Sequence, residues 1–224
     1  MSALSTLSIT ILFDNEAAIE GCETGWGFSC WVEAHGMRLI FDTGWDGAQV
    51  IANAARLGID LASADAIFIS HPHWDHMGGL PALLSVVGAP VFVPASISDH
   101  LKGEIARHCD VRSISAPALL APGIRSTGEM GGEPKEQSLL VETDDGVVVI
   151  TGCAHPGLEA IIDRAALTAP VLGVVGGFHA FSALERLASI ELVCPCHCTV
   201  ARQAILDRFA EHALPGGVGA TICR

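Results

Sequence analysis

The segment from His71 to His76 reads HPHWDH and places four potential metal-binding side chains within six residues, directly after the apolar stretch 66–69. Side chains two residues apart diverge on a helix but point to the same side of an extended chain. Pro72 lacks an amide hydrogen and disfavours helical angles at His71, which makes the segment extended. His71 and His73 therefore converge on one point. Once the chain turns, Asp75 and His76 can converge on a second, which predicts two metal ions in one pocket.

A polar loop with histidines scattered by chance is the alternative interpretation. It would have to place three histidines and one aspartate in six positions, between an apolar strand and the Gly78-Gly79 turn. Imidazole and carboxylate groups together are typical of zinc, manganese and iron sites. We therefore favour a metal site.

Half of the 224 residues are hydrophobic and the mean hydropathy is +0.46, so the chain can bury a sizeable core. No linker is evident, and we expect a single domain over residues 1–224. The sequence contains no run of about 18 apolar residues, so no membrane span is expected. The segment 1–6 lacks the basic region of a secretory signal, so a cytoplasmic location is expected. In that compartment the eight cysteines are expected to be reduced, and a disulfide framework is the weaker interpretation.

The charge balance restricts the partners. Twenty-five acidic residues against twelve basic ones give a formal net charge of −13. Such a surface repels a phosphate backbone, which argues against nucleic acid as a partner. We expect a small-molecule substrate, whose anionic group would be held by metal, by loop amides or by an arginine. The sequence leaves the oligomeric state open.

The pattern of apolar residues predicts an α+β fold. Strands are expected at 7–13, 28–34, 38–41, 66–70, 91–93, 111–115, 138–143, 147–151, 171–175 and 192–193. Helices are expected at 48–57, 81–87, 98–109, 158–166 and 183–190, and from 198 or 199 to about 209. The segment 123–136, rich in Gly and Glu, is expected to be a long surface loop near the site. Strand-rich halves that are each followed by helices indicate an αββα sandwich, in which two mixed sheets pack face to face with helices outside.

Three further segments each consist of an apolar strand, a loop of small residues and a histidine. They contain His155 in TGCAHPG, His179 in GGFH and His197 in CPCHC. A single histidine of this kind is more often structural than a ligand. Together with the first cluster, however, they would complete two coordination shells. We rank His155 and His197 first as ligands, followed by Cys153 or His179.

Two other features allow more than one interpretation. Asp42, in FDTG, is either a turn or capping residue, or a carboxylate that orients metal-bound imidazoles. The alternating Cys194, Cys196 and Cys198 could hold a separate structural zinc, but Pro195 and the neighbouring histidine favour a tight loop.

The segment HPHWDHMGGL resembles the metallo-β-lactamase superfamily, whose hallmark is an HxHxDH loop after a buried strand. Asp42 in FDTG matches the earlier motif of that superfamily. A narrower group includes the archaeal dihydropterin-ribofuranosylaminobenzene 5'-phosphate synthases and many bacterial relatives. The segments that resemble this group are 25–29, 136–139, 151–157, 176–179 and 196–199.

The resemblance implies an αββα fold with a dinuclear site at the sheet edges. By position, His71 and His73 would hold the first metal, and Asp75 and His76 the second. His197 would complete the second site.

The resemblance also shows a departure from the superfamily pattern. Many members have a metal-binding histidine well before a bridging aspartate in a GD pair. Here Glu136-Gln137 stands near the expected histidine, and Gly152-Cys153 replaces the GD pair. His155 could compensate on either metal. The implied cofactors are two divalent ions, zinc first, with manganese or iron as alternatives.

The implied activity is that of a metal-dependent hydrolase acting on a small anionic metabolite through a metal-bound hydroxide. Asp75 would bind metal and orient the hydroxide, while His179 would stabilise an oxyanion or transfer protons. One alternative is a transferase of the 7,8-dihydropterin-6-methyl-4-(β-D-ribofuranosyl)aminobenzene 5'-phosphate synthase type. The other is a non-catalytic metal-binding or redox-sensing module, in which the cysteine-rich loop matters most.

Overall fold

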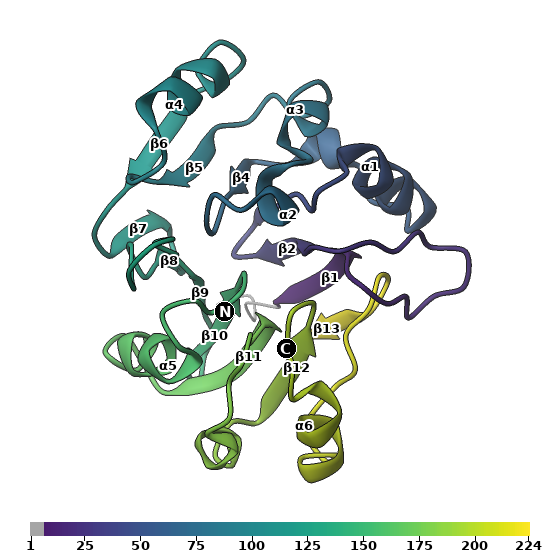
Figure 1. Cartoon of the computed structure of the whole chain (residues 1–224), viewed down its shortest axis with the longest axis vertical. Coiled ribbons are helices and arrows are strands. Elements are labelled where there is room, and N and C mark those ends of the chain that lie inside the picture. Colours follow the sequence, from purple (N-terminus) through teal and green to yellow (C-terminus); the bar gives the residue numbers. More distant parts are fainter. Residues whose placement is uncertain (1–6) are drawn as a thin grey trace, which may run out of the picture.

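The structure is a computed structural model that describes residues 7–224. Two mixed sheets pack face to face, with helices on the outer sides (Figure 1). In spatial order, the first sheet contains β13 (Thr221–Cys223), β1 (Ser8–Phe13), β2 (Ser29–Ala34), β3 (Met37–Phe41), β4 (Ala66–Phe68), β5 (Val91–Pro94) and β6 (Val111–Ile114). The second contains β12 (Leu192–Cys196), β11 (Val171–Gly177), β10 (Val147–Thr151), β9 (Leu139–Glu142), β8 (Ile124–Ser126) and β7 (Ala118–Ala121). The predicted αββα fold is confirmed.

The helices of the described chain are short. They are α1 (Gly47–Arg56), α2 (Trp74–Met77), α3 (Leu80–Leu83), α4 (Asp99–Ile105), α5 (Leu158–Ala166) and α6 (Arg202–Arg208), with 3-10 turns η1 (Leu61–Ser63) and η2 (Leu184–Leu187). No helix within residues 7–224 is both long and apolar enough to cross a membrane. The expectation about a secretory signal concerns residues 1–6, which lie outside the described part of the chain.

Apolar side chains fill three layers. Between the sheets, Phe41 stacks on Phe68 with ring centroids 5.5 Å apart, and Ile150 reaches the same layer from β10. Helices α1 and α3 cover the outer face of the first sheet, and α5 and α6 cover that of the second. Strand β10 is therefore buried on both faces, which explains why its sequence is an unbroken apolar run rather than an alternating one.

Helix α1 shows how the local sequence defines a helix and the face that it packs against the sheet. The Asp46 carboxylate accepts hydrogen bonds from the amides of Ala48 and Gln49, which caps the helix as Ser, Thr, Asp and Asn commonly do. Val50 and Ala54, one turn apart, are buried against the sheet. The predicted helix at 48–57 is confirmed within one residue at each end.

The carboxyl ends of parallel strands meet at one edge of the sandwich. Strands β3 to β6 run parallel in the first sheet, and β10 to β12 run parallel in the second. The segments that leave these strand ends carry Asp42, His71, Cys153, His179 and His197. The amide of Gly177 donates to the carbonyl of Gly152 at 3.0 Å, which ties the ends of β10 and β11 together. This edge is where α/β folds place ligands.

The prediction of a long surface loop over 123–136 is wrong in part. Residues Ile124–Ser126 form β8, which pairs with β9, and Glu136 is buried at 1% exposure. A three-residue strand is too short to show a period of two, so it forms only because its neighbour supplies the hydrogen bonds. The edge strands β7 and β13, of four and three residues, were not predicted either.

Several predicted helices are also shorter in the structure. The expected helix at 183–190 contains only the 3-10 turn η2, and the helix expected at 98–109 is α4, which ends at Ile105.

We predict that Gly176→Ala destabilises the fold by about 2–5 kcal/mol. Gly176 has a φ of +122°, and a Cβ there would lie 1.9 Å from the Thr151 carbonyl oxygen. Gly103, in α4, has no atom within 4 Å of such a Cβ, so Gly103→Ala should instead stabilise by about 0.5–1 kcal/mol. Urea unfolding of both variants measures the two effects. Equal stability of the two variants would contradict this reading of β11.

Candidate metal centre

The predicted change from extended chain to turn is present in the HPHWDH segment. His73 has extended angles, with φ −70° and ψ 144°, and it immediately precedes α2, which carries Asp75 and His76. The rings of His71 and His73 lie 4.7 Å apart. The carbonyl of Ser70 accepts from the amide of Gln137, which joins this segment to the second sheet.

The potential ligands form two sets. His71, His73 and His155 each offer a ligand atom within 4.8 Å of the others, and so do Asp75, His76 and His197. His155, which the sequence could not assign to either set, thus lies with His71 and His73.

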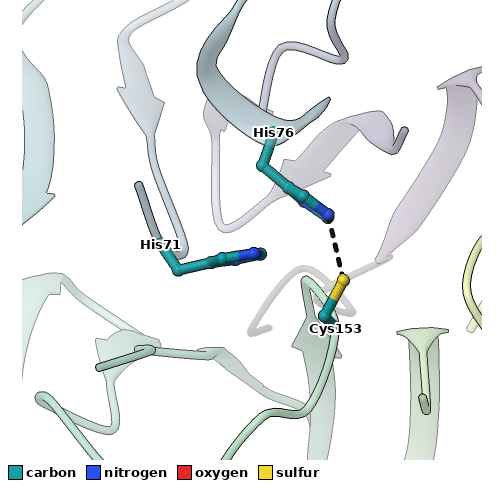
Figure 2. Close-up of side chains that lie close together, drawn as sticks. All are labelled: His71, His76 and Cys153. Atoms are coloured by element: carbon teal, nitrogen blue, oxygen red, sulfur yellow. Dashed lines mark hydrogen bonds between the residues drawn. The ribbon is translucent and has the colours of Figure 1, made fainter. Parts of the chain in front are cut away.

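Cys153 lies between the two sets. It groups with His71 from the first and His76 from the second, again within 4.8 Å. Figure 2 shows these three side chains pointing toward one another, with the Nε2 of His76 3.1 Å from the Cys153 Sγ. A cation held by these residues would meet a thiol at Gly152-Cys153, where the resemblance to the superfamily implies the carboxylate of a GD pair.

The outer nitrogens of His71 and His76 are both tied to one buried carboxylate. The Ser70 hydroxyl donates to Asp42 Oδ2 at 2.6 Å, so its oxygen is left to accept from the Nδ1 of His71 at 2.8 Å. The Nδ1 of His76 donates to the same Asp42 oxygen at 2.7 Å. Both imidazoles therefore carry their proton on Nδ1 and turn the Nε2 lone pair toward the centre, as metal ligands do.

His155 and His197 are oriented in the same way. The Nδ1 of His155 lies 2.9 Å from Glu136 Oε2, and that of His197 lies 3.1 Å from Asn15 Oδ1. The Asp14 carboxylate also accepts from the amide of His197 at 2.8 Å. Asp14 and Asn15 follow β1, and sequence analysis did not single them out.

The free nitrogens supply a test of whether a metal fits. Among the described residues, the buried Nε2 atoms of His71 and His197 have no hydrogen-bond partner. A buried polar atom without a partner is costly, and native structures rarely keep one unless an ion or water completes it. The donor set of imidazoles, a carboxylate and a thiol therefore fits divalent cations such as zinc.

Burial keeps the central imidazoles neutral. It lowers the pKa of His71 to about 3, with repulsion from His76 acting in the same direction. It also lowers the pKa of His76 to about 3, with His197 as the main repelling neighbour. At neutral pH neither ring must lose a proton before binding a cation.

Glu136 has a role that sequence analysis missed. Its carboxylate accepts from the amides of residues 152–155 and from the Thr151 hydroxyl, in addition to His155 Nδ1. Burial alone would raise the pKa of Glu136, but the hydrogen bonds from the side chain and the amide of His155 hold it well below its usual range. The anion thus fixes the whole TGCAH loop and the ring of His155. The sequence signal was a charged residue immediately before a buried strand.

Asp75 and Cys153 respond to their surroundings in opposite directions. Burial opposes ionisation of Asp75, yet the close approach of His197, whose Nε2 lies 3.3 Å from the Asp75 carboxylate, holds its pKa well below the usual range. The neighbouring Cys198 thiol and burial raise the pKa of Cys153 well above its ordinary value. A coordinated thiol nevertheless gives up its proton, so a cation at this place would reverse the second effect.

Cys198 is a further candidate that sequence analysis did not assign to this centre. It groups with Cys153 and His197 within 4.8 Å. The thiols of Cys194 and Cys196 instead lie 3.8 Å apart in the core between the sheets. The backbone of His197 is left-handed, with φ 47°, which turns Cys198 out of line with the strand. The alternating cysteines therefore do not gather around one point.

His179 stands beside the ligand sets rather than within them. Its ring centroid lies 5.3 Å from that of His155, and it lines the same recess as His73 and His197. It is exposed, and its backbone is left-handed with φ 47°. Asp42 and Ala154 share this unusual backbone conformation. Such strain is characteristic of functional sites.

Comparison with known proteins supports the architecture. A sequence model described as the metallo-beta-lactamase superfamily matches residues 27–197. The chain belongs to this superfamily. The resemblance inferred from HPHWDH and FDTG is thereby confirmed.

Individual superfamily members align over nearly the whole chain. A 7,8-dihydropterin-6-methyl-4-(beta-D-ribofuranosyl)-aminobenzene-5'-phosphate synthase from Methanocaldococcus jannaschii is 26% identical, over 84% of this chain and 85% of that protein. Tm1679, a metal-dependent hydrolase of the beta-lactamase superfamily, has a TM-score of 0.78 at 27% identity, over 96% of this chain and 98% of that one. The metallo-beta-lactamase fold protein YhfI from Bacillus subtilis has a TM-score of 0.73 at 12% identity, over 98% of this chain and 100% of that one. This likeness shows a shared fold.

We predict that His73→Ala loses the ion held by the first ligand set. Loss of a side chain that only orients a ligand lowers metal affinity by roughly 10–100-fold. Removing one of three imidazole ligands should lower the affinity for that ion by at least as much. Metal analysis after equilibrium dialysis against zinc measures the change. His100→Ala, at an exposed position of α4, is the control and should keep the wild-type metal content. An unchanged zinc content in His73→Ala would remove His73 from the site.

We also predict that Cys153 binds metal through sulfur. In protein loaded with cobalt(II), a thiolate ligand gives a sulfur-to-metal charge-transfer band in the near ultraviolet, and Cys153→Ser should abolish it. Cys223→Ser, at an exposed position of β13, should leave the band intact. If the band survives in Cys153→Ser and disappears in Cys198→Ser, the sulfur ligand is Cys198 instead.

Proposed function

We propose that the chain is a metal-dependent hydrolase with two divalent ions at the carboxyl ends of its parallel strands. The observation that carries the proposal is the arrangement of the ligands. Two three-ligand sets lie on either side of Cys153, and four of their imidazoles have Nδ1 held by a neighbouring side chain. Residues placed only for packing would not need this common orientation.

The donor set indicates which metal and which chemistry to expect. Imidazole and thiol together favour zinc, with iron next, whereas manganese prefers oxygen ligands. Two such ions would lower the pKa of water and polarise the reacting oxygen of a phosphoryl or carbonyl group. The fold also leaves room for a substrate, because the site opens into a recess of about 450 Å³.

Asp75 and His179 are proposed to handle protons. The Asp75 carboxylate lies 3.3 Å from His197 Nε2 and stays ionised, so it can accept a hydrogen bond from the attacking water and orient it. His179, on the open side of His155, can donate a proton to the leaving oxygen or a hydrogen bond to a developing oxyanion. Asp75 belongs to one ligand set, and His179 lies beside His155 of the other.

The substrate is proposed to be small and anionic. The site recess and a neighbouring one of about 290 Å³ share His155 and His179, and neither is lined by a lysine or arginine. With a net charge of −13, the chain offers few other attractions for an anion. The sequence left metal, loop amides and an arginine as possible partners of the anionic group. We propose that the metal ions hold it, because no arginine lines either recess.

A synthase of the dihydropterin type is the second candidate, favoured by the relative that is 26% identical over 84% of the chain. Incubation with a dihydropterin diphosphate and 4-(β-D-ribofuranosyl)aminobenzene 5'-phosphate, followed by mass spectrometry, tests it directly. A coupled product would support a synthase, and its absence would remove this candidate.

We predict that the zinc-loaded protein hydrolyses at least one member of a panel of small phosphate esters, carboxylic esters and lactones. In water labelled with ¹⁸O, the label should enter the product. Chelation should abolish turnover, zinc should restore it, and Asp75→Asn should reduce it by about 100-fold or more. The His100→Ala variant should remain fully active. A protein that binds both ions yet turns over nothing in the panel or the coupling assay would favour the non-catalytic metal-binding module.

A further inference from the structure

Indole side chains are unusually exposed in this chain. Of its four tryptophans, Trp26, Trp45 and Trp74 are 54%, 46% and 58% exposed, whereas Trp31 lies in the core at 3%. A large apolar ring left in water lowers stability, and clusters of such rings mark binding surfaces.

The exposed indoles gather at the opening of the metal centre. Trp26 and Trp74 line the recess of about 450 Å³ that also contains the ligand histidines. Trp74 lies between His73 and Asp75 in the sequence, so the ligands that turn inward leave its side chain at the rim. The Trp45 ring meets Trp74 edge to face, with centroids 5.8 Å apart, and supports it from behind.

Trp26 is held in place by the segment around it. Gly27 has a φ of +146°, and a Cβ there would lie 2.3 Å from the Asp75 carbonyl oxygen. The amide of Phe28 donates to that same oxygen at 3.3 Å. The Trp26 ring lies 4.9 Å from the His197 ring in an edge-to-face contact. An indole fixed in this way loses little freedom when a ligand stacks on it.

The surroundings indicate what such a ligand is made of. Neither recess at the centre is lined by a cationic side chain, so only a group at the metal ligands can be strongly anionic. The remainder of a substrate in this recess would lie beside two indoles, and indole rings favour flat, polarisable rings through stacking. The rim is concave and opens onto the ligands, which suits a small molecule better than a protein surface.

We infer that Trp26 and Trp74 bind a planar aromatic or heteroaromatic ring of the substrate, next to the group that reacts at the metal centre. This inference rests on the proposed function for the identity of the reacting group. It adds a substrate class, namely small anionic compounds that carry an aromatic ring.

Two probes that share an anionic anchor isolate the contribution of the ring. Adenosine 5'-monophosphate and ribose 5-phosphate have the same sugar and phosphate, and only the first carries a heteroaromatic ring. We expect the zinc-loaded protein to bind the adenosine compound about 10-fold more tightly by calorimetry. We also expect only this probe to quench tryptophan fluorescence, because two of the four indoles line the recess and a third contacts one of them.

The variants assign the preference to the rim. Trp26→Ala and Trp74→Ala should each reduce the ratio of the two affinities, and the double variant should bring it close to one. Trp26→Phe should retain most of it, and Leu119→Ala, which removes a side chain of similar exposure on β7, should leave it unchanged.

Two results would overturn the inference. One is a wild-type protein that binds both probes alike, or that binds neither. The other is a double variant that keeps the full ring preference. Zinc content and hydrolysis are measured separately, and normal values for both together with no ring preference would refute this inference alone. A ring preference without turnover would instead count against the proposed hydrolase.

Discussion

One buried carboxylate, that of Asp42, connects the two sets of candidate metal ligands. It accepts from the amide and hydroxyl of Ser70 and from His76, and through Ser70 it also orients His71. Burial raises the pKa of Asp42 to about 7, opposed by the hydrogen bonds from the hydroxyl and amide of Ser70. The same carboxylate thus fixes one imidazole in each ligand set. Without it, both rings could rotate or change tautomer, and the two sets would lose their common orientation.

The rest of the centre repeats this arrangement from other strand ends. Glu136 fixes the loop that carries Cys153 and His155, while Asp14 and Asn15 fix His197. Each of these side chains is a hydrogen-bond acceptor that lies next to a strand of one of the two sheets. The ligands therefore inherit the rigidity of the sandwich, which is what a site needs if it is to hold cations in a defined geometry.

The elements that could be predicted from the sequence are those in which the signal is local. The hairpin around Asp144-Asp145-Gly146 and helix α1 with its Asp46 cap follow from turn chemistry and helical spacing within a few residues. Strands β7, β8 and β13 have only three or four residues and depend on partners elsewhere in the chain. For the same reason, the sequence could mark Glu136 as a departure from the family pattern but could not reveal the four amides that surround it.

The sequence alone determined the αββα architecture, the ligand-rich HPHWDH segment and the further histidines at strand ends. Pro72, the apolar strands and the superfamily motifs act over short stretches, which a single chain displays directly. Only the tertiary structure decided that His155 lies with His71 and His73, that Cys153 stands between the two sets and that Cys198 joins it. It also decided that two exposed indoles flank the opening. These outcomes depend on how two sheets pack and where parallel strands end, and that information is spread over contacts far apart in the chain.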